Sequence, residues 1–270
     1  MATMNKVRVF SKQEIIDKLK KISEMGWIEN RRRGNQGGVG NTLEDLLGVE
    51  ENNLPIPNAS EWELKTQRLG TSALTTLLHS EPSPRAVGFV SQVLLPNYGW
   101  EPNREFIDYP KGELSFRQTI NGMSRTDRGF MVEINRKERK ITISFDAKTV
   151  DVHHSRWLKS VAERTGLGEL NPQPYWGFDD LEHKAGIKLP NCFYVQAEVK
   201  RKNRNEFYKY SKVLMLQKFN FENFLKGIEE AKVLIDFDAR SGHNHGTKFR
   251  LRQNSLPLLY KKATTIVELL

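Results

Sequence analysis

The fold turns on one short run, Pro55-Ile-Pro-Asn-Ala-Ser-Glu-Trp-Glu63-Leu64-Lys65, in which a proline-broken loop leads into a strand. From Glu61 to Arg68 the side chains alternate in the manner of a β-strand. Residues two apart on a strand share a face, so Glu63 and Lys65 emerge together while Leu64 points to the core. A carboxylate and an ammonium held side by side can converge on one phosphate.

The elements around this strand predict a mixed α/β protein. A capping box, Ser11 to Glu14, opens a helix expected from Ser11 to Met25. A basic, glycine-rich run, Gly34 to Gly40, reads as an irregular loop before a short helix, Leu43 to Leu47. Further expected elements are strands 73–79, 116–120, 130–134, 140–146, 232–237 and 249–252, helices 84–95 and 221–231, and a hairpin of 192–200 with 208–217 around a basic tip, 201–205. This order favours an α/β core with a β-rich addition.

Composition narrows the class of partner. The 270 residues carry 42 Lys and Arg against 33 Asp and Glu, a net charge of +9, which favours a polyanion, although many proteins with other functions are also basic. A single cysteine, Cys192, excludes an internal disulfide, reads as a buried strand residue and fits a reducing cytoplasm. With no secretion signal and no run of eighteen apolar residues, we expect a cytoplasmic protein with no membrane partner.

The residue types at Glu63 and Lys65 suit phosphodiester hydrolysis. That chemistry needs a hard cation held by oxygen ligands and positive charge near the reacting phosphate. The pattern E-x-K is common, and a solvated strand face is the alternative interpretation. Glu44, on the short helix before the strand, could supply another acidic ligand. The usual signature also has an aspartate a few residues earlier, where this chain has Asn58.

Several motifs together resemble the MvaI and BcnI restriction endonucleases, relatives of the mismatch-repair nicking enzyme MutH within the PD-(D/E)xK group. The likeness touches both ends of the chain and is weakest between Asn97 and Tyr175. It is carried by Gly26-Trp27, Arg31 to Gly34, Gly40-Asn-Thr-Leu-Glu-Asp-Leu-Leu47, Glu51-Asn-Asn, Pro57-Asn58, Glu63-Leu-Lys-Thr66, Leu74-Thr-Thr-Leu-Leu-His79, Glu206-Phe-Tyr-Lys-Tyr210 and Gly242-His-Asn-His-Gly-Thr247-Lys-Phe-Arg250.

The resemblance implies a catalytic set of Glu44, Asn58, Glu63 and Lys65, with Asn58 and Glu63 at the positions that hold Mg²⁺. An amide oxygen is a weaker ligand than a carboxylate, so Asn58 should lower both metal affinity and activity. The asparagine is either natural or a substitution that lets DNA bind uncut. The intact motif positions around it favour a substitution.

Basic and histidine residues are the candidates for DNA contact. For His243 and His245, zinc binding, a solvated loop and base contact all remain open, and the resemblance favours base contact. His79 is either a structural histidine or, by resemblance, a reader of the central base pair. We expect Arg250 and Arg252, on one strand face, to contact bases, and we place Lys248 beside them. Arg31, Arg32 and Arg33 are expected to bind phosphates, although surface lysines and arginines are often only solvated.

The sequence therefore predicts a restriction-endonuclease-like α/β core with a β-rich recognition lobe, catalytic over 1–100 and mainly DNA-binding over 101–270, with some later elements packing on the core. By resemblance, the expected target is double-stranded DNA at a CC-N-GG pseudopalindrome, with CCSGG favoured by the two histidines. The resemblance also implies a monomer that nicks the strands in turn, with a DNA methyltransferase as its functional partner. A non-catalytic DNA-binding protein and a MutH-like repair nickase are the alternatives.

Overall fold

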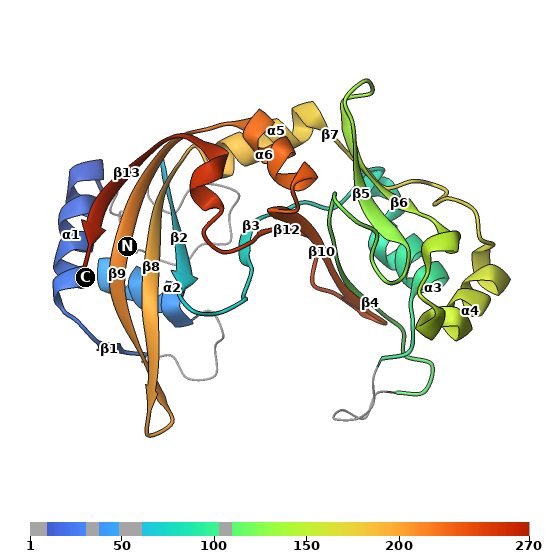
Figure 1. The fold of residues 1–270 in the computed structure, drawn as a ribbon, viewed down its shortest axis with the longest axis horizontal. Helices are drawn as coiled ribbons and strands as arrows, with labels where there is room; N and C mark the ends of the chain where they lie inside the picture. The colour runs from blue at the N-terminus through green and yellow to red at the C-terminus, as the bar shows by residue number, and fades with distance from the viewer. Residues whose placement is uncertain (1–9, 31–37, 49–60, 103–109, 270) are drawn as a thin grey trace, which may run out of the picture. The chain divides into compact units, whose positions relative to one another are not determined.

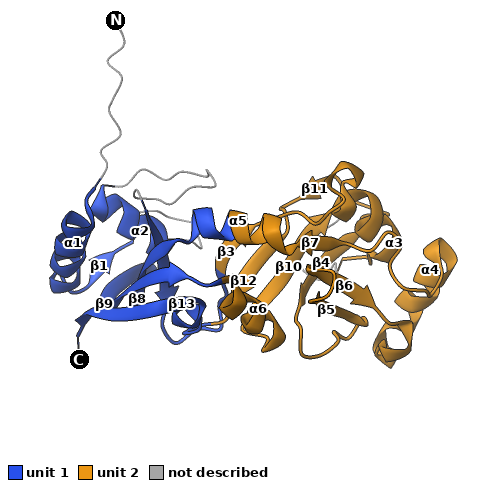
Figure 2. Ribbon diagram, turned by 90° about the horizontal axis from the view of Figure 1, so that it is seen from above, with its two compact units in different colours: residues 1–75, 184–220, 253–270 blue, residues 76–183, 221–252 orange. Residues whose placement is uncertain are grey.

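A computed structural model of the chain describes residues 10–30, 38–48, 61–102 and 110–269. The chain divides into two compact units, coloured separately in Figure 2. Unit 1 comprises residues 1–75, 184–220 and 253–270, and unit 2 comprises residues 76–183 and 221–252. Each unit is thus assembled from segments far apart in the sequence, and the expected division into catalytic and recognition lobes stays a prediction.

Unit 1 is built on a mixed sheet. Its order is β1 (Ile28–Glu29), β9 (Asn205–Phe219), β8 (Asn191–Lys202) and β2 (Trp62–Arg68), with β13 (Tyr260–Glu268) also paired to β9. Strand β2 runs parallel to β8, and every other pair is antiparallel. In the parallel register Glu63 lies opposite Cys192 and Lys65 opposite Tyr194. The predicted strand at Glu61 to Arg68 and the predicted hairpin are confirmed.

Two helices, α1 (Lys12–Glu24) and α2 (Gly38–Leu47), cover one face of this sheet (Figure 1). The capping box of α1 is formed, since the Glu14 amide donates to Ser11 Oγ and the Ser11 amide donates to the Glu14 carboxylate. Apolar residues of both helices pack against Trp62 and Leu64 of β2 in one buried cluster. The core side of β2 is therefore the Leu64 side, as the alternation predicted.

The expected start of the second helix was wrong. Helix α2 begins at Gly38, inside the glycine-rich run that read as irregular, rather than at Leu43. A Cβ at Gly38 would lie 2.6 Å from Asn30 Nδ2 and 2.7 Å from Tyr208 Oη. Close packing therefore requires a glycine there, and burial of Val39 and Leu43 offsets the low helix propensity of the glycines.

Unit 2 holds two further sheets. One has the order β11 (His243–Asn244), β10 (Val233–Arg240), β12 (Lys248–Leu251) and β3 (Thr75–His79), with β4 (Ser115–Ile120) also paired to β10. The other has the order β5 (Phe130–Asn135), β6 (Lys140–Phe145) and β7 (Tyr175–Gly177). The expected strand 249–252 is shorter at its end, since β12 stops at Leu251.

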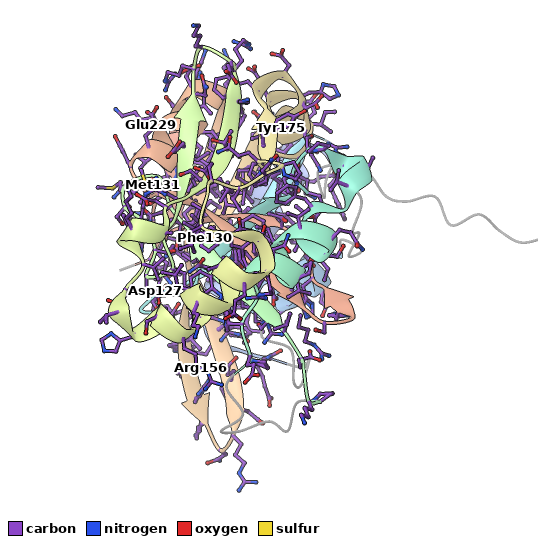
Figure 3. All side chains as sticks on the ribbon, turned by 90° about the vertical axis from the view of Figure 1, so that its right-hand side faces the viewer. Asp127, Phe130, Met131, Arg156, Tyr175 and Glu229 are labelled. Carbon is purple, nitrogen blue, oxygen red and sulfur yellow. The ribbon has the colours of Figure 1, made fainter. Side chains whose placement is uncertain are left out.

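Aromatic side chains fill the interior of unit 2. Phe130 is fully buried and its ring contacts those of Tyr98, Phe116 and Phe145. Figure 3 labels Phe130 near the middle of this view and the exposed Glu229 towards its edge. The helices of this unit are α3 (Leu95–Tyr98), α4 (Ser155–Thr165) and α6 (Phe221–Glu229), and α5 (Phe178–Lys188) runs from unit 2 into unit 1.

The single helix expected from Pro84 to Leu95 was also wrong. The segment divides into a 3₁₀ turn, Arg85–Val87, and a π-helical stretch, Val90–Leu94, that continues into α3. Gly88 adopts a left-handed conformation, with φ of 60°, which ends the first turn. The overall prediction of a mixed α/β fold is confirmed, whereas α4, α5 and β13 were not anticipated.

Candidate functional site

Strand β2 presents Glu63 and Lys65 on one face, as the sequence predicted. The Lys65 Nζ lies 2.9 Å from Glu63 Oε1. Only 2% of the Glu63 side chain is exposed, against 15% of Lys65. The alternative of a solvated strand face is therefore wrong. Removing a carboxylate from water costs free energy, so carboxylates are buried only when they are paired.

A second ammonium, not anticipated from the sequence, meets the same carboxylate. Lys188, the last residue of α5, places its Nζ 3.2 Å from Glu63 Oε2, and its side chain is 16% exposed. Each oxygen of Glu63 thus faces one lysine. Lys188 lies 125 positions from Glu63 in number, and only the parallel pairing of β2 with β8, which follows α5, brings it there.

Behind the carboxylate, the site is closed by neutral buried groups. Burial raises the pKa of the Cys192 thiol, and the negative charge of Glu63 raises it further. Burial also raises the pKa of the Tyr260 hydroxyl well above its ordinary value, and the negative charge of Glu63 again adds to the effect. Both groups therefore keep their protons, and Glu63 is the charged acceptor of this part of the site.

The same face of the sheet continues into a network of amides. Gln67 and Gln196 both donate through Nε2 to Asn254 Oδ1, at 3.1 and 2.9 Å, and the Asn254 amide donates back to Gln67 Oε1 at 3.0 Å. Both glutamines are buried. These bonds fix β2 against β8 and the segment before β13, so the backbone that carries Glu63 and Lys65 is held rigidly.

The donor chemistry fits a hard cation. Glu63 offers carboxylate oxygens, and the nearby sulfur, Cys192, is buried and protonated. Among the residues that the structure describes, no group of three or more His, Cys, Asp or Glu side chains could form a complete metal site. A divalent ion here would need further oxygens, from position 58, from the phosphate or from water.

Of the two other residues of the expected catalytic set, Glu44 and Asn58, the structure describes only Glu44. Glu44 is half-buried on α2, the helix that packs on β2. Asn58 lies outside the described residues, as do Arg31, Arg32 and Arg33. Their expected roles therefore rest on the sequence alone.

In unit 2 the structure brings the candidate histidines to one end of a sheet. His79 is the last residue of β3, and a Cβ at Gly246 would lie 3.6 Å from its Cδ2. The rings of His243 and His245 meet edge to face, with their centroids 4.2 Å apart. Both are exposed, and the described residues offer no further ligand that would complete a metal site around them.

The basic residues of β12 form ion pairs with aspartates of the neighbouring strand β10. Arg250 pairs with Asp236 at 3.1 Å and Lys248 with Asp238 at 3.6 Å, both partners lying on β10. Arg252 lies one residue past the end of β12, and its Nε donates to the Ala231 carbonyl at 2.7 Å. The expectation that Arg252 belongs to the strand was therefore wrong, whereas its expected contact with bases stays a prediction.

An open pocket of about 370 Å³ adjoins His243. Its lining includes the exposed polar residues Ser91 and Gln92 of the π-helical stretch, Arg240 of β10 and Asn244 of β11. Gln92 was not a candidate from the sequence, since its segment read as a covering helix. π-Helical turns occur frequently at functional sites, and this turn is the local feature that singles out Gln92.

Comparison with known proteins now adds to this geometry. The family model of the MvaI/BcnI restriction endonuclease family matches residues 16–260. The chain belongs to this family. As a member of a restriction endonuclease family it is a DNA endonuclease.

Two solved structures have the same fold. A complex described as restriction endonuclease MvaI with cognate DNA substrate matches with a TM-score of 0.74 and 24% identity, over 96% of this chain and 100% of that one. The structure of MvaI in the absence of DNA matches with a TM-score of 0.54 and 24% identity, over 99% of this chain and 100% of that one. The curated proteins yielded no match. No helix in the described parts of the chain is long and apolar enough to cross a membrane.

Proposed function

We propose that this member of the family hydrolyses double-stranded DNA at a short GC-rich pseudopalindrome of the CC-N-GG kind, with Glu63 and Lys65 as its catalytic pair. The observation that carries this proposal is the buried Glu63 carboxylate with an ammonium at 2.9 Å on the same strand face. A carboxylate and an ammonium in this relation can serve a metal ion and a phosphate at once.

The chain's own residues would divide the work. Glu63, rigidly held by the sheet, supplies an anionic oxygen ligand, and Asn58 supplies a neutral one. The Lys65 ammonium would donate a hydrogen bond to the reacting phosphate or to the attacking water, and so stabilise the negative charge that develops. Mg²⁺, when bound, would polarise the phosphate and activate that water. Because an amide replaces a carboxylate at position 58, we expect this chain to be inactive or impaired as it stands.

Sequence recognition is proposed for the other candidate residues. His79 and His243 would meet the major-groove edge of the central base pair, and the preference would be for C or G there, as in CCSGG. His245 would also contact the DNA. Arg250, Lys248 and Arg252 would contact the flanking pairs, and Arg31, Arg32 and Arg33 would bind phosphates. In this proposal unit 1 carries the catalysis and unit 2 most of the base recognition.

We further propose a monomeric, cytoplasmic enzyme that nicks one strand and then the other, with a DNA methyltransferase as its functional partner. Product analysis resolved by strand would test this order. A MutH-like repair nickase should stop after one cut.

The decisive experiment is Asn58→Asp, assayed for Mg²⁺-dependent cleavage of duplexes containing CC-N-GG sites. Cleavage should appear or rise, and Lys65→Ala in the Asn58→Asp background should abolish it while duplex binding persists. Lys209→Ala is a matched control, because its ammonium also pairs with a carboxylate of this sheet, Glu198, at 3.3 Å. If Asn58→Asp gains no cutting, the chain is better described as a DNA-binding protein without catalysis.

A further inference from the structure

The loop that carries His243 and His245 is fastened to the end of β3 by one carboxylate. Glu81 Oε1 accepts from the Thr247 amide at 2.8 Å, and Glu81 Oε2 accepts from the Thr247 hydroxyl at 3.0 Å. Next to this pair the Ser80 amide donates to the Thr247 carbonyl at 3.0 Å. Thr247 is therefore held through its amide, its carbonyl and its side chain.

The fastening has a consequence for the histidines. Glu81 follows His79 by two residues, and Thr247 follows His245 by two. Gly246, between His245 and Thr247, lies close to both Glu81 and His79. A Cβ at this position would lie 3.4 Å from Glu81 Oε1 and 3.6 Å from His79 Cδ2. The Glu81–Thr247 contact thus sets how close the histidine loop comes to the His79 ring.

Further contacts hold the two sides of the Glu81–Thr247 contact in place. The Ser80 carbonyl accepts from Trp176 Nε1 at 2.9 Å, and Ser80 and Trp176 are both buried, so the β3 side of the contact is rigid. On the loop side, the His245 amide donates to the Asp238 carbonyl and the Gly246 amide donates to Asn244 Oδ1. These bonds hold the loop to β10 and to itself, and Thr247 joins it to the β3 end through Ser80 and Glu81.

We propose that Glu81 is a positioning residue for base discrimination, which fixes His79 and the loop of residues 243–247 as one rigid reading unit. The proposal rests on the proposed function, in which these histidines read the central pair. A group held at a fixed distance loses no binding free energy to ordering when DNA arrives, and a small displacement removes a hydrogen bond to a base edge.

A first experiment tests the Glu81–Thr247 contact without DNA. Hydrogen exchange followed by mass spectrometry should show faster exchange over residues 242–247 in Glu81→Ala than in wild type, with other peptides unchanged. Thr247→Val removes only the hydroxyl bond and should give a smaller increase. Equal protection of this loop in all three proteins would overturn the proposal whatever the DNA assay shows.

A second experiment tests discrimination, by competition binding in Ca²⁺ between otherwise identical duplexes containing CCCGG or CCAGG. Loss of one base contact corresponds to about tenfold in affinity, so Glu81→Ala should narrow the ratio of the two affinities by at least about fivefold. Glu81→Gln keeps an acceptor for the Thr247 amide and should remain within about twofold of the wild-type ratio. Thr247→Val should fall between them, and it serves alone if Glu81→Ala does not fold.

Glu169→Ala is the matched control, because Glu169, like Glu81, accepts two hydrogen bonds within unit 2, here from the backbone amides of Phe145 and Leu170. This variant should be destabilised with an unchanged affinity ratio. An equal fall of the ratio in Glu169→Ala, or no fall in Glu81→Ala and Thr247→Val, would overturn the positioning role. A wild-type protein that does not distinguish the two duplexes, with the loop still released in Glu81→Ala, would instead refute the proposed reading of the central pair.

Discussion

Replacement of Glu63 by glutamine should strongly destabilise the fold, because it removes a negative charge that pairs with two lysines. The side chain is 2% exposed, with Lys65 Nζ at 2.9 Å and Lys188 Nζ at 3.2 Å. Glutamine has nearly the same volume and retains one carbonyl acceptor, so the packing changes little. The variant therefore isolates the charge.

The size of the effect follows from these distances. At an effective dielectric constant of about 20, two unit charges about 3 Å apart attract by roughly 5 to 6 kcal/mol. The desolvation of three charged groups offsets much of that attraction, and disruption of a buried pair typically costs about 3–5 kcal/mol. We expect Glu63→Gln to lower the free energy of unfolding within that range.

Urea denaturation followed by circular dichroism measures the loss, provided that the dependence on urea concentration is unchanged. The control is Glu198→Gln, the same substitution on the neighbouring strand, where the carboxylate is 42% exposed and pairs with Lys209 at 3.3 Å. An exposed pair of this kind contributes less than about 1 kcal/mol. If Glu63→Gln costs no more than this control, the two lysines do not depend on Glu63 and our account of the site is wrong.

Three further predictions concern stability and reactivity. Burial and a hydrogen bond to Glu206 raise the pKa of Tyr208 to about 12. This tyrosine therefore ionises in the unfolded chain before it ionises in the folded one, and the fold should lose stability between about pH 10 and 12. The urea midpoint should fall less over this interval in Tyr208→Phe than in wild type. Burial raises the pKa of Cys192, so a thiol reagent at about pH 8 should label it only after unfolding, and rapid labelling of the native protein would contradict this. Gly38→Ala should lower the melting temperature, because overpacking costs about 1–3 kcal/mol of folding free energy. Gly186→Ala in α5, with no atom near the added Cβ, should instead stabilise the fold by up to about 1 kcal/mol. A change of the same sign in both variants would refute the packing argument.

Local patterns in the sequence determined the elements that need no distant partner. The capping box at Ser11 and the apolar spacing after it predicted α1, since both act within a few residues. Strict alternation predicted β2 and the shared face of Glu63 and Lys65, because side chains alternate along any strand. One of the family motifs, Glu63-Leu-Lys-Thr66, lies on β2, and short motifs of this kind allowed the family to be predicted from the sequence.

Tertiary structure alone decided what crosses between segments. Nothing local distinguishes Lys188 from other lysines at helix ends, and its place beside Glu63 depends on the pairing of β2 with β8. Gly38 is helical because close packing stabilises the helix there, despite the low helix propensity of the glycine-rich run. Glu81 likewise acquires its partner, Thr247, from a segment 166 residues away in the chain. A sequence pattern reports which face a side chain occupies, but only the folded sheets determine which other side chain it meets there.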